Sequence, residues 1–194
     1  MMTKYYRTPV FASKLVCRAL CGVVPGVENT LADFNAGDGF LLGDIPVKSF
    51  LTLHDTPESV GYRFDGDASV LFATDLGCIT REILDASKRV DMAIIEANHD
   101  VELLKNGKYP YFLQKRILSE HGHLSNDDSG SFAKTLVESG VRQIVLAHLS
   151  RENNTPRLAL ETVSQQIVES GAVIGRDVAV DVAPPDGMGQ VYTV

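Results

Sequence analysis

The sequence contains no tryptophan, only three cysteines and no long apolar run. Spanning a bilayer takes an apolar run of roughly 20 residues, and no run here approaches that length. The N-terminal residues MMTKYYRTPVF also lack the apolar core of a signal peptide. We therefore expect a soluble, cytoplasmic protein with no membrane partner. Because Cys17 and Cys21 lie four residues apart on a predicted helix, we expect reduced thiols rather than disulfides.

Positive charge is scarce as well. The chain has 18 Lys and Arg against 25 Asp and Glu, a formal net charge of -7. This excess disfavours sequence-independent binding to a phosphate backbone by the protein alone, so a nucleic-acid substrate would need metal cations to supply positive charge. The sequence also has no Gly-rich phosphate loop, no serine nucleophile elbow and no Cys-x-x-Cys pair.

What the chain does contain predicts one α/β domain over residues 1–194. With 194 residues and 44% hydrophobic residues, it can bury one substantial core. Short apolar runs predict strands, and apolar positions three and four apart predict helices. The expected strands cover residues 9–12, two segments within 38–53, and 60–64, 69–73, 92–95, 144–147, 178–182 and 190–193. The expected helices cover residues 13–20, 79–88, 101–105, 111–119, 126–139 and 156–170.

Four of these strands end in side chains that can do chemistry. The run Val70-Leu71-Phe72-Ala73 is followed by Asp75, and the three other strands lead into further polar residues. Burial disfavours charge, so a carboxylate at this position indicates a cap, a turn or a site. Carboxyl ends of strands in layered α/β proteins are where ligands and metals bind. The polar residues after the other three strands are His54, then Glu96, Asn98 and His99, then His148.

The histidines carry the chemical hypothesis. Four of the five, His54, His99, His123 and His148, lie at strand ends or in loops. Imidazole and carboxylate together are the ligand set of zinc, manganese and iron. A single such histidine is more often structural, but a shared position at strand ends favours a joint site.

Two of the neighbouring residues allow plainer interpretations. Asp100 can simply cap the helix that begins at Val101. The Gly-flanked His123 suits a mobile general acid or base, but it can equally be a hydrogen-bonded loop histidine.

Five segments resemble the metallo-β-lactamase-fold hydrolases, in particular their YycJ-like (WalJ) branch. They are LHDTPESVGYRF, LFATDLG, IIEANHD, NGKYPYFLQKRILSEHGHLSN and IVLAHLSRENNTP. The resemblance runs from Thr8 onward and implies a four-layer αββα sandwich, α+β in some schemes, with two divalent ions, zinc or manganese, at one rim.

Matched by motif, the resemblance also implies roles for individual residues. His54 and His148 would be metal ligands, and Asp75 would bridge both ions at the catalytic centre. His123 would be the catalytic proton donor. Glu96, Asn98 and His99 would line the site behind the ligands or contact substrate.

One part of the family pattern is missing. The signature His-x-His-x-Asp-His, which supplies four of the seven usual ligands, is absent from the sequence and would lie upstream of KYYRTPVFASK. We therefore expect an N-terminally shortened sandwich whose metal binding is weak or absent, since each of two ions would keep about two protein ligands. Exposed strand edges then favour a homo-oligomer.

Three functions follow from these observations. The first is a metal-dependent phosphodiesterase or nuclease acting on single-stranded nucleic acid or another phosphodiester, with little activity in this chain. The second is a catalytically silent remnant that serves as a binding or structural module. The third is a hydrolase of a small ester, thioester or lactone, since one fold hosts many substrates.

Overall fold

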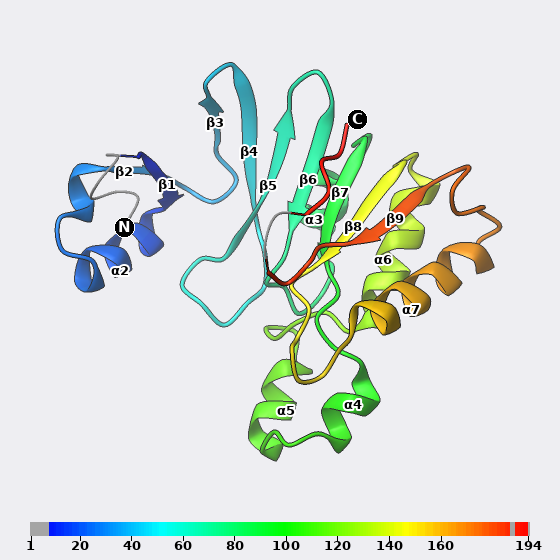
Figure 1. The fold of residues 1–194 in the computed structure, drawn as a ribbon. Coiled ribbons are helices and arrows are strands. Elements are labelled where there is room, and N and C mark those ends of the chain that lie inside the picture. The colour runs from blue at the N-terminus through cyan, green and yellow to red at the C-terminus, as the bar shows by residue number, and fades with distance from the viewer. Residues whose placement is uncertain (1–7, 187–188, 194) are drawn as a thin grey trace.

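The computed structural model describes residues 8–186 and 189–193 (Figure 1). Its main layer is a seven-stranded sheet in the order β3-β4-β5-β6-β7-β8-β9. Strands β3 to β6 pair antiparallel, and β6 to β9 pair parallel. The strands are β3 (Gly39–Leu42), β4 (Ile45–Leu51), β5 (Val60–Asp65), β6 (Ser69–Ala73), β7 (Met92–Glu96), β8 (Gln143–Ala147) and β9 (Ala179–Val182).

Three helices cover one face of this sheet: α3 (Arg81–Ala86), α6 (Asn126–Glu138) and α7 (Pro156–Glu169). Successive side chains of β6 point to opposite faces of the sheet, and the helices cover one of these faces. Leu71 and Ala73 are fully buried, while Phe72 between them is 39% exposed. Leu71 and Ala73 belong to one apolar core with residues of all three helices, including Phe132 and Val163. The expected mixed α/β fold class is confirmed.

The N-terminal part forms a small unit beside β3 (Figure 1). It comprises β1 (Val10–Ser13), α2 (Lys14–Val23), the short 3-10 helix η1 (Val27–Asn29) and β2 (Leu31–Phe34), with β1 and β2 paired in parallel. Stacking of Phe11 on Phe40, with ring centroids 5.0 Å apart, joins this unit to β3. The sequence analysis missed β2 and η1, because the pattern Leu-Ala-Asp-Phe is short and carries a charge.

Several expected boundaries needed correction. Helix α2 runs on to Val23, beyond the expected end at residue 20, and α3 is shorter than the expected helix over residues 79–88. The strand expected at residues 190–193 is wrong, because these residues form no strand. The expected cap of α4 is confirmed, since Asp100 accepts a hydrogen bond from a backbone N–H group of the first turn, and Ser125 caps α6 in the same way.

Two further helices, α4 (Val101–Asn106) and α5 (Tyr111–Ile117), lie beyond one end of the sheet (Figure 1). They fill the connection between β7 and α6, and they stand next to the residues that follow the strands. No helix among the described residues is long and apolar enough to cross a membrane. The three cysteines, all within the described ranges, form no disulfide.

The outer edge of β3 leads us to expect self-association. Within the described ranges no strand pairs with this edge, and Leu41 and Leu42 are 64% and 47% exposed. An unpaired apolar edge is a template for pairing with another chain. We expect a dimer or larger assembly that Leu41→Lys shifts toward monomer, measured by light scattering after size-exclusion chromatography. The matched control is Val168→Lys, at an exposed position of α7. A monomeric unmodified chain would contradict the expectation.

Candidate metal centre

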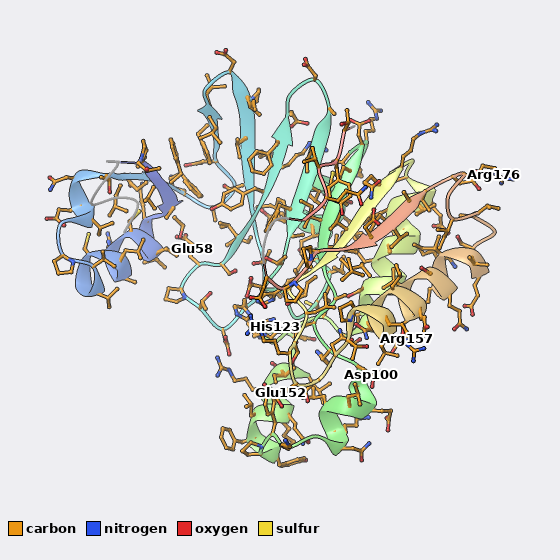
Figure 2. The ribbon with its side chains drawn as sticks, viewed as in Figure 1. Glu58, Asp100, His123, Glu152, Arg157 and Arg176 are labelled. Atoms are coloured by element: carbon orange, nitrogen blue, oxygen red, sulfur yellow. The ribbon has the colours of Figure 1, made fainter. Side chains whose placement is uncertain are left out.

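The chain brings three histidines and one aspartate together where the strands end. The Nε2 atom of His54 lies 3.7 Å from Asp75 Oδ1, and the Nε2 atom of His148 lies 3.6 Å from the same oxygen. The ring of His123 stands between the other two rings, with centroids 4.7 Å from His54 and 5.2 Å from His148. Figure 2 shows His123 between the lower end of the sheet and α5. Residues nearly one hundred positions apart therefore form one cluster.

Glu96 orients two of these histidines through hydrogen bonds. Its side chain is fully buried, and its Oε1 accepts hydrogen bonds from Nδ1 of His123 at 2.7 Å and of His148 at 2.6 Å. Its Oε2 accepts the backbone N–H groups of Leu76 at 3.1 Å and Leu124 at 3.3 Å. All acceptor sites of the carboxylate are thus in use, so Glu96 orients the imidazoles and leaves their Nε2 atoms free to face the cluster.

The hydrogen bonds between Glu96 and the two histidines also determine the protonation state of Glu96. Burial alone would raise the pKa of Glu96, but the hydrogen bonds from His123 and His148 outweigh it and lower that pKa. In return, the hydrogen bond to Glu96 raises the pKa of His148. Glu96 therefore stays a carboxylate beneath the histidines.

His54 is oriented by a different partner. Its Nδ1–H donates to the carbonyl of Gly122 at 2.9 Å, so its Nε2 also faces Asp75. Gly122 is required here, because a Cβ at this position would lie 2.1 Å from the carbonyl oxygen of Ile117. The glycine lets the loop run against the end of α5 and bring both its carbonyl and His123 into place.

Two of the four described non-glycine residues with positive φ belong to the cluster. Asp75 has φ 59° and His148 has φ 57°, both in the left-handed region that non-glycine residues rarely adopt. Such conformations cost about 1–3 kcal/mol each and persist where the surroundings enforce them, often at functional sites. Here they turn both side chains toward each other immediately after β6 and β8.

Asp75 lies close to two candidate histidine ligands, although His54, Asp75 and His148 together do not form a group whose donor atoms all lie within 4.8 Å of one another. A tetrahedral zinc ion with ligands at about 2.0–2.1 Å separates its donors by about 3.4 Å, close to the distances from Asp75 Oδ1 to His54 and His148. Donor atoms of His54, Asp75 and His123 also lie within 4.8 Å of one another. Glu96, His123 and His148 form a second such group, but the full set of hydrogen bonds to Glu96 makes that group a support rather than a ligand set.

Asn98 and His99 have different surroundings. Asn98 lines the cleft described below, and its Nδ2 donates to the carbonyl of His148 at 2.9 Å. His99 is 1% exposed, and neither ring nitrogen has a hydrogen-bond partner among the described residues. It does not line the cleft. Burial lowers its pKa to about 4.

The family model of the beta-lactamase superfamily domain matches residues 2–149 of this chain. The chain belongs to the beta-lactamase superfamily. Exodeoxyribonuclease YycJ of Bacillus anthracis is 34% identical over 179 residues, which cover 90% of this chain and 67% of that protein. Exodeoxyribonuclease WalJ of Streptococcus pneumoniae strain D39 is 37% identical over 154 residues, which cover 79% of this chain and 57% of that protein.

Among solved structures, the metallo-beta-lactamase fold protein YhfI from Bacillus subtilis superposes with a TM-score of 0.63 at 14% identity, covering 90% of this chain and 61% of that one. These similarities confirm the expected fold and the resemblance to the YycJ-like branch. The superfamily fold implies divalent metal binding, and the group around Asp75 is suited to it. The chain spans about three fifths to two thirds of the length of the two curated relatives.

The cleft of this superfamily member has a volume of about 400 Å³. Its lining combines the three histidines with Tyr109, which lies just before α5, with Arg116 of α5 and with Arg151 of the loop after β8. Arg116 pairs with Asp55, beside His54, and this pairing lowers the pKa of Asp55. A neighbouring cavity of about 540 Å³ shares His148 and Arg151 with the cleft.

The sequence analysis did not single out Arg116 or Arg151. Arg116 lies on a helix with ordinary spacing and Arg151 in a polar loop, and only the folded chain brings both to the cleft. The family resemblance did not point to them either, because it was applied only to the ligands, the proton donor and the three residues expected to line the site.

Proposed function

We propose that this chain is a metal-dependent hydrolase that cleaves phosphodiester bonds of nucleic acid. The observation that carries the proposal is the common orientation of His54, His123 and His148, whose Nδ1 atoms are all held by protein acceptors so that their Nε2 atoms are left free for the cluster with Asp75. The names of the two curated relatives, both exodeoxyribonucleases, favour nucleic acid as the substrate class.

Individual residues of the chain are suited to metal binding, proton transfer and phosphate binding in such a reaction. His54, Asp75 and His148 would hold divalent metal, zinc or manganese, which when bound polarises a phosphate and lowers the pKa of a water molecule. His123 donates its Nδ1–H to Glu96, and in the imidazolium form its Nε2–H can deliver a proton to the leaving oxygen and leave the neutral ring. Arg116 and Arg151 place positive charge on the cleft wall against a phosphate.

We expect weak metal binding and slow turnover. Asp75 together with a single histidine gives an ion about two protein ligands, whereas a stable zinc site has three or four. Without metal, the carboxylates of Asp55 and Asp75 would repel a phosphate. The measurement is elemental analysis after dialysis against micromolar zinc or manganese. Two tightly held ions per chain would contradict this expectation and require further ligands.

Cleavage of end-labelled single-stranded DNA, with and without added manganese, tests the function itself. We expect slow cleavage, below the ~1–10³ s⁻¹ of typical enzymes, that requires metal and disappears in Asp75→Ala. In His123→Ala we expect a roughly 10²- to 10⁴-fold loss on DNA. The loss should be smaller on bis(p-nitrophenyl) phosphate, whose leaving group needs no proton. Absence of metal-dependent cleavage from a folded, metal-loaded chain would instead favour a silent binding module.

A further inference from the structure

The region from α4 to α5 differs in charge from the rest of the molecule. Residues 101–117 contain four basic side chains and one acidic side chain, Glu102, within a chain of net charge -7. Lys105 lies 3.9 Å from the Glu102 carboxylate. The other three basic residues, Lys108, Lys115 and Arg116, are exposed. A local basic surface therefore exists where the overall composition predicted none.

The same region presents two aromatic side chains to solvent. Tyr111 is 70% exposed and Phe112 is 73% exposed. The Lys115 ammonium lies 5.0 Å from the centroid of the Tyr111 ring. Neither ring contributes to the buried core, so packing of the domain does not account for them. Exposed aromatic rings interleaved with lysines are the surface that nonspecific binders of single-stranded nucleic acid use.

This surface continues directly into the cleft. Phe112 precedes Arg116 by four residues, so the two lie on one side of α5 about 6 Å apart along the helix. Arg116 lines the cleft and pairs with Asp55, the neighbour of His54. A strand with one phosphate in the cleft can thus place its next base over α5. Figure 2 shows α5 directly beyond His123.

We propose that Tyr111 and Phe112, together with Lys108 and Lys115, form a stacking platform that binds unpaired bases of single-stranded nucleic acid beside the cleft. This inference rests on the proposed function and names its substrate class. Stacking requires a free base face, which a paired duplex hides between neighbouring base pairs. The lysines add backbone contacts that do not depend on sequence.

The absence of tryptophan from the chain gives a direct assay. Phe112→Trp introduces a single tryptophan, and its fluorescence should be quenched to saturation by oligothymidylate in EDTA, where no cleavage occurs. An abasic oligomer of the same length carries the same charge but no bases, and it should quench little. Val168→Trp, at an exposed position of α7, is the matched control and should not respond.

Affinity measurements on the otherwise unmodified chain complete the test. Each of Tyr111→Ala and Phe112→Ala should weaken binding of labelled oligothymidylate by about 5- to 150-fold, in line with the loss of one stacked base. Lys108→Gln and Lys115→Gln should each reduce the slope of log affinity against log salt by about 0.7. Phe112→Tyr should retain binding. Circular dichroism confirms that each variant is folded.

The outcomes separate this inference from the proposed function. Equal quenching by the abasic oligomer, or alanine variants that bind normally, would overturn the platform. A blunt duplex binding as well as the single strand would overturn it too. Cleavage of bis(p-nitrophenyl) phosphate in the same variants reports on the metal centre alone. If that cleavage persists while oligothymidylate does not bind, the platform fails and the hydrolase stands.

Discussion

Glu96→Gln is expected to weaken zinc binding by about 10- to 100-fold, although Glu96 is not itself a ligand. Its Oε1 holds the Nδ1–H groups of His123 and His148, and its Oε2 holds two backbone N–H groups. An amide has one acceptor oxygen and one donor nitrogen. It can therefore satisfy only one of these pairs, and the NH₂ group would face donors at the other.

The same substitution should destabilise the fold. Two buried donors lose their acceptor, at about 1–3 kcal/mol each in the free energy of unfolding. Glu96→Ala, which empties the site, should cost at least as much, because four donors lose their acceptor. Urea denaturation without metal measures the stability, and competition against a zinc indicator in the absence of urea measures the affinity.

A matched control is Glu102→Gln, which removes the same charge from an exposed position on α4. It should change neither quantity by more than a few tenths of a kcal/mol. If Glu96→Gln keeps normal zinc affinity while folded, the histidines are oriented without Glu96 and the account of the centre is wrong.

The metal centre shows what the sequence could and could not predict. Strand ends were visible as short apolar runs, so the convergence of His54, Asp75 and His148 followed from the rule that carboxyl ends meet at one edge. The hydrogen bonds from His123 and His148 to Glu96 could not be predicted, because they depend on side-chain rotamers and on the path of the loop at Gly122. Likewise, the left-handed conformations at Asp75 and His148 have no sequence signal when the residue is not glycine.

The N-terminal unit and the last segment illustrate a different limit. The run Gln190-Val191-Tyr192-Thr193 has strand propensity, yet it forms no strand. Propensity describes how a residue fits a pleated surface, and only pairing with a neighbour makes a strand. Conversely, β2 pairs with β1 although Asp33 interrupts its apolar pattern.

The stability of the folded chain should fall steeply in weak acid because of His99. Burial lowers the pKa of this histidine from 6.5 to about 4. Below pH 6.5 the unfolded chain binds a proton at this histidine and the folded chain does not. The unfolded state is therefore stabilised relative to the folded state as the pH falls. The difference between 6.5 and about 4, at 1.36 kcal/mol per pKa unit, corresponds to about 3 kcal/mol lost by pH ~4.

Two groups of the metal centre, His148 and Glu96, change their contributions to stability in other pH ranges. The pKa of His148 is raised, so its contribution is complete below pH 6.5 and is lost only as the pH rises through its folded value. The pKa of Glu96 is lowered from 4.5, so its contribution is present above that pH and is lost below it. The range from about pH 6.5 to pH 4.5 therefore reports mainly on His99.

His99→Leu tests the assignment. Leucine fills a similar volume and removes two buried nitrogens that have no partner among the described residues, so stability near pH 7 should be unchanged or higher. Urea denaturation at pH ~7 and pH ~5 should show the unmodified chain losing about 2 kcal/mol more than the variant. His121→Leu, at an exposed loop position, should keep the full loss. An unchanged pH dependence in His99→Leu would mean that His99 is protonated in the folded chain, and that its ring nitrogens reach water or a partner.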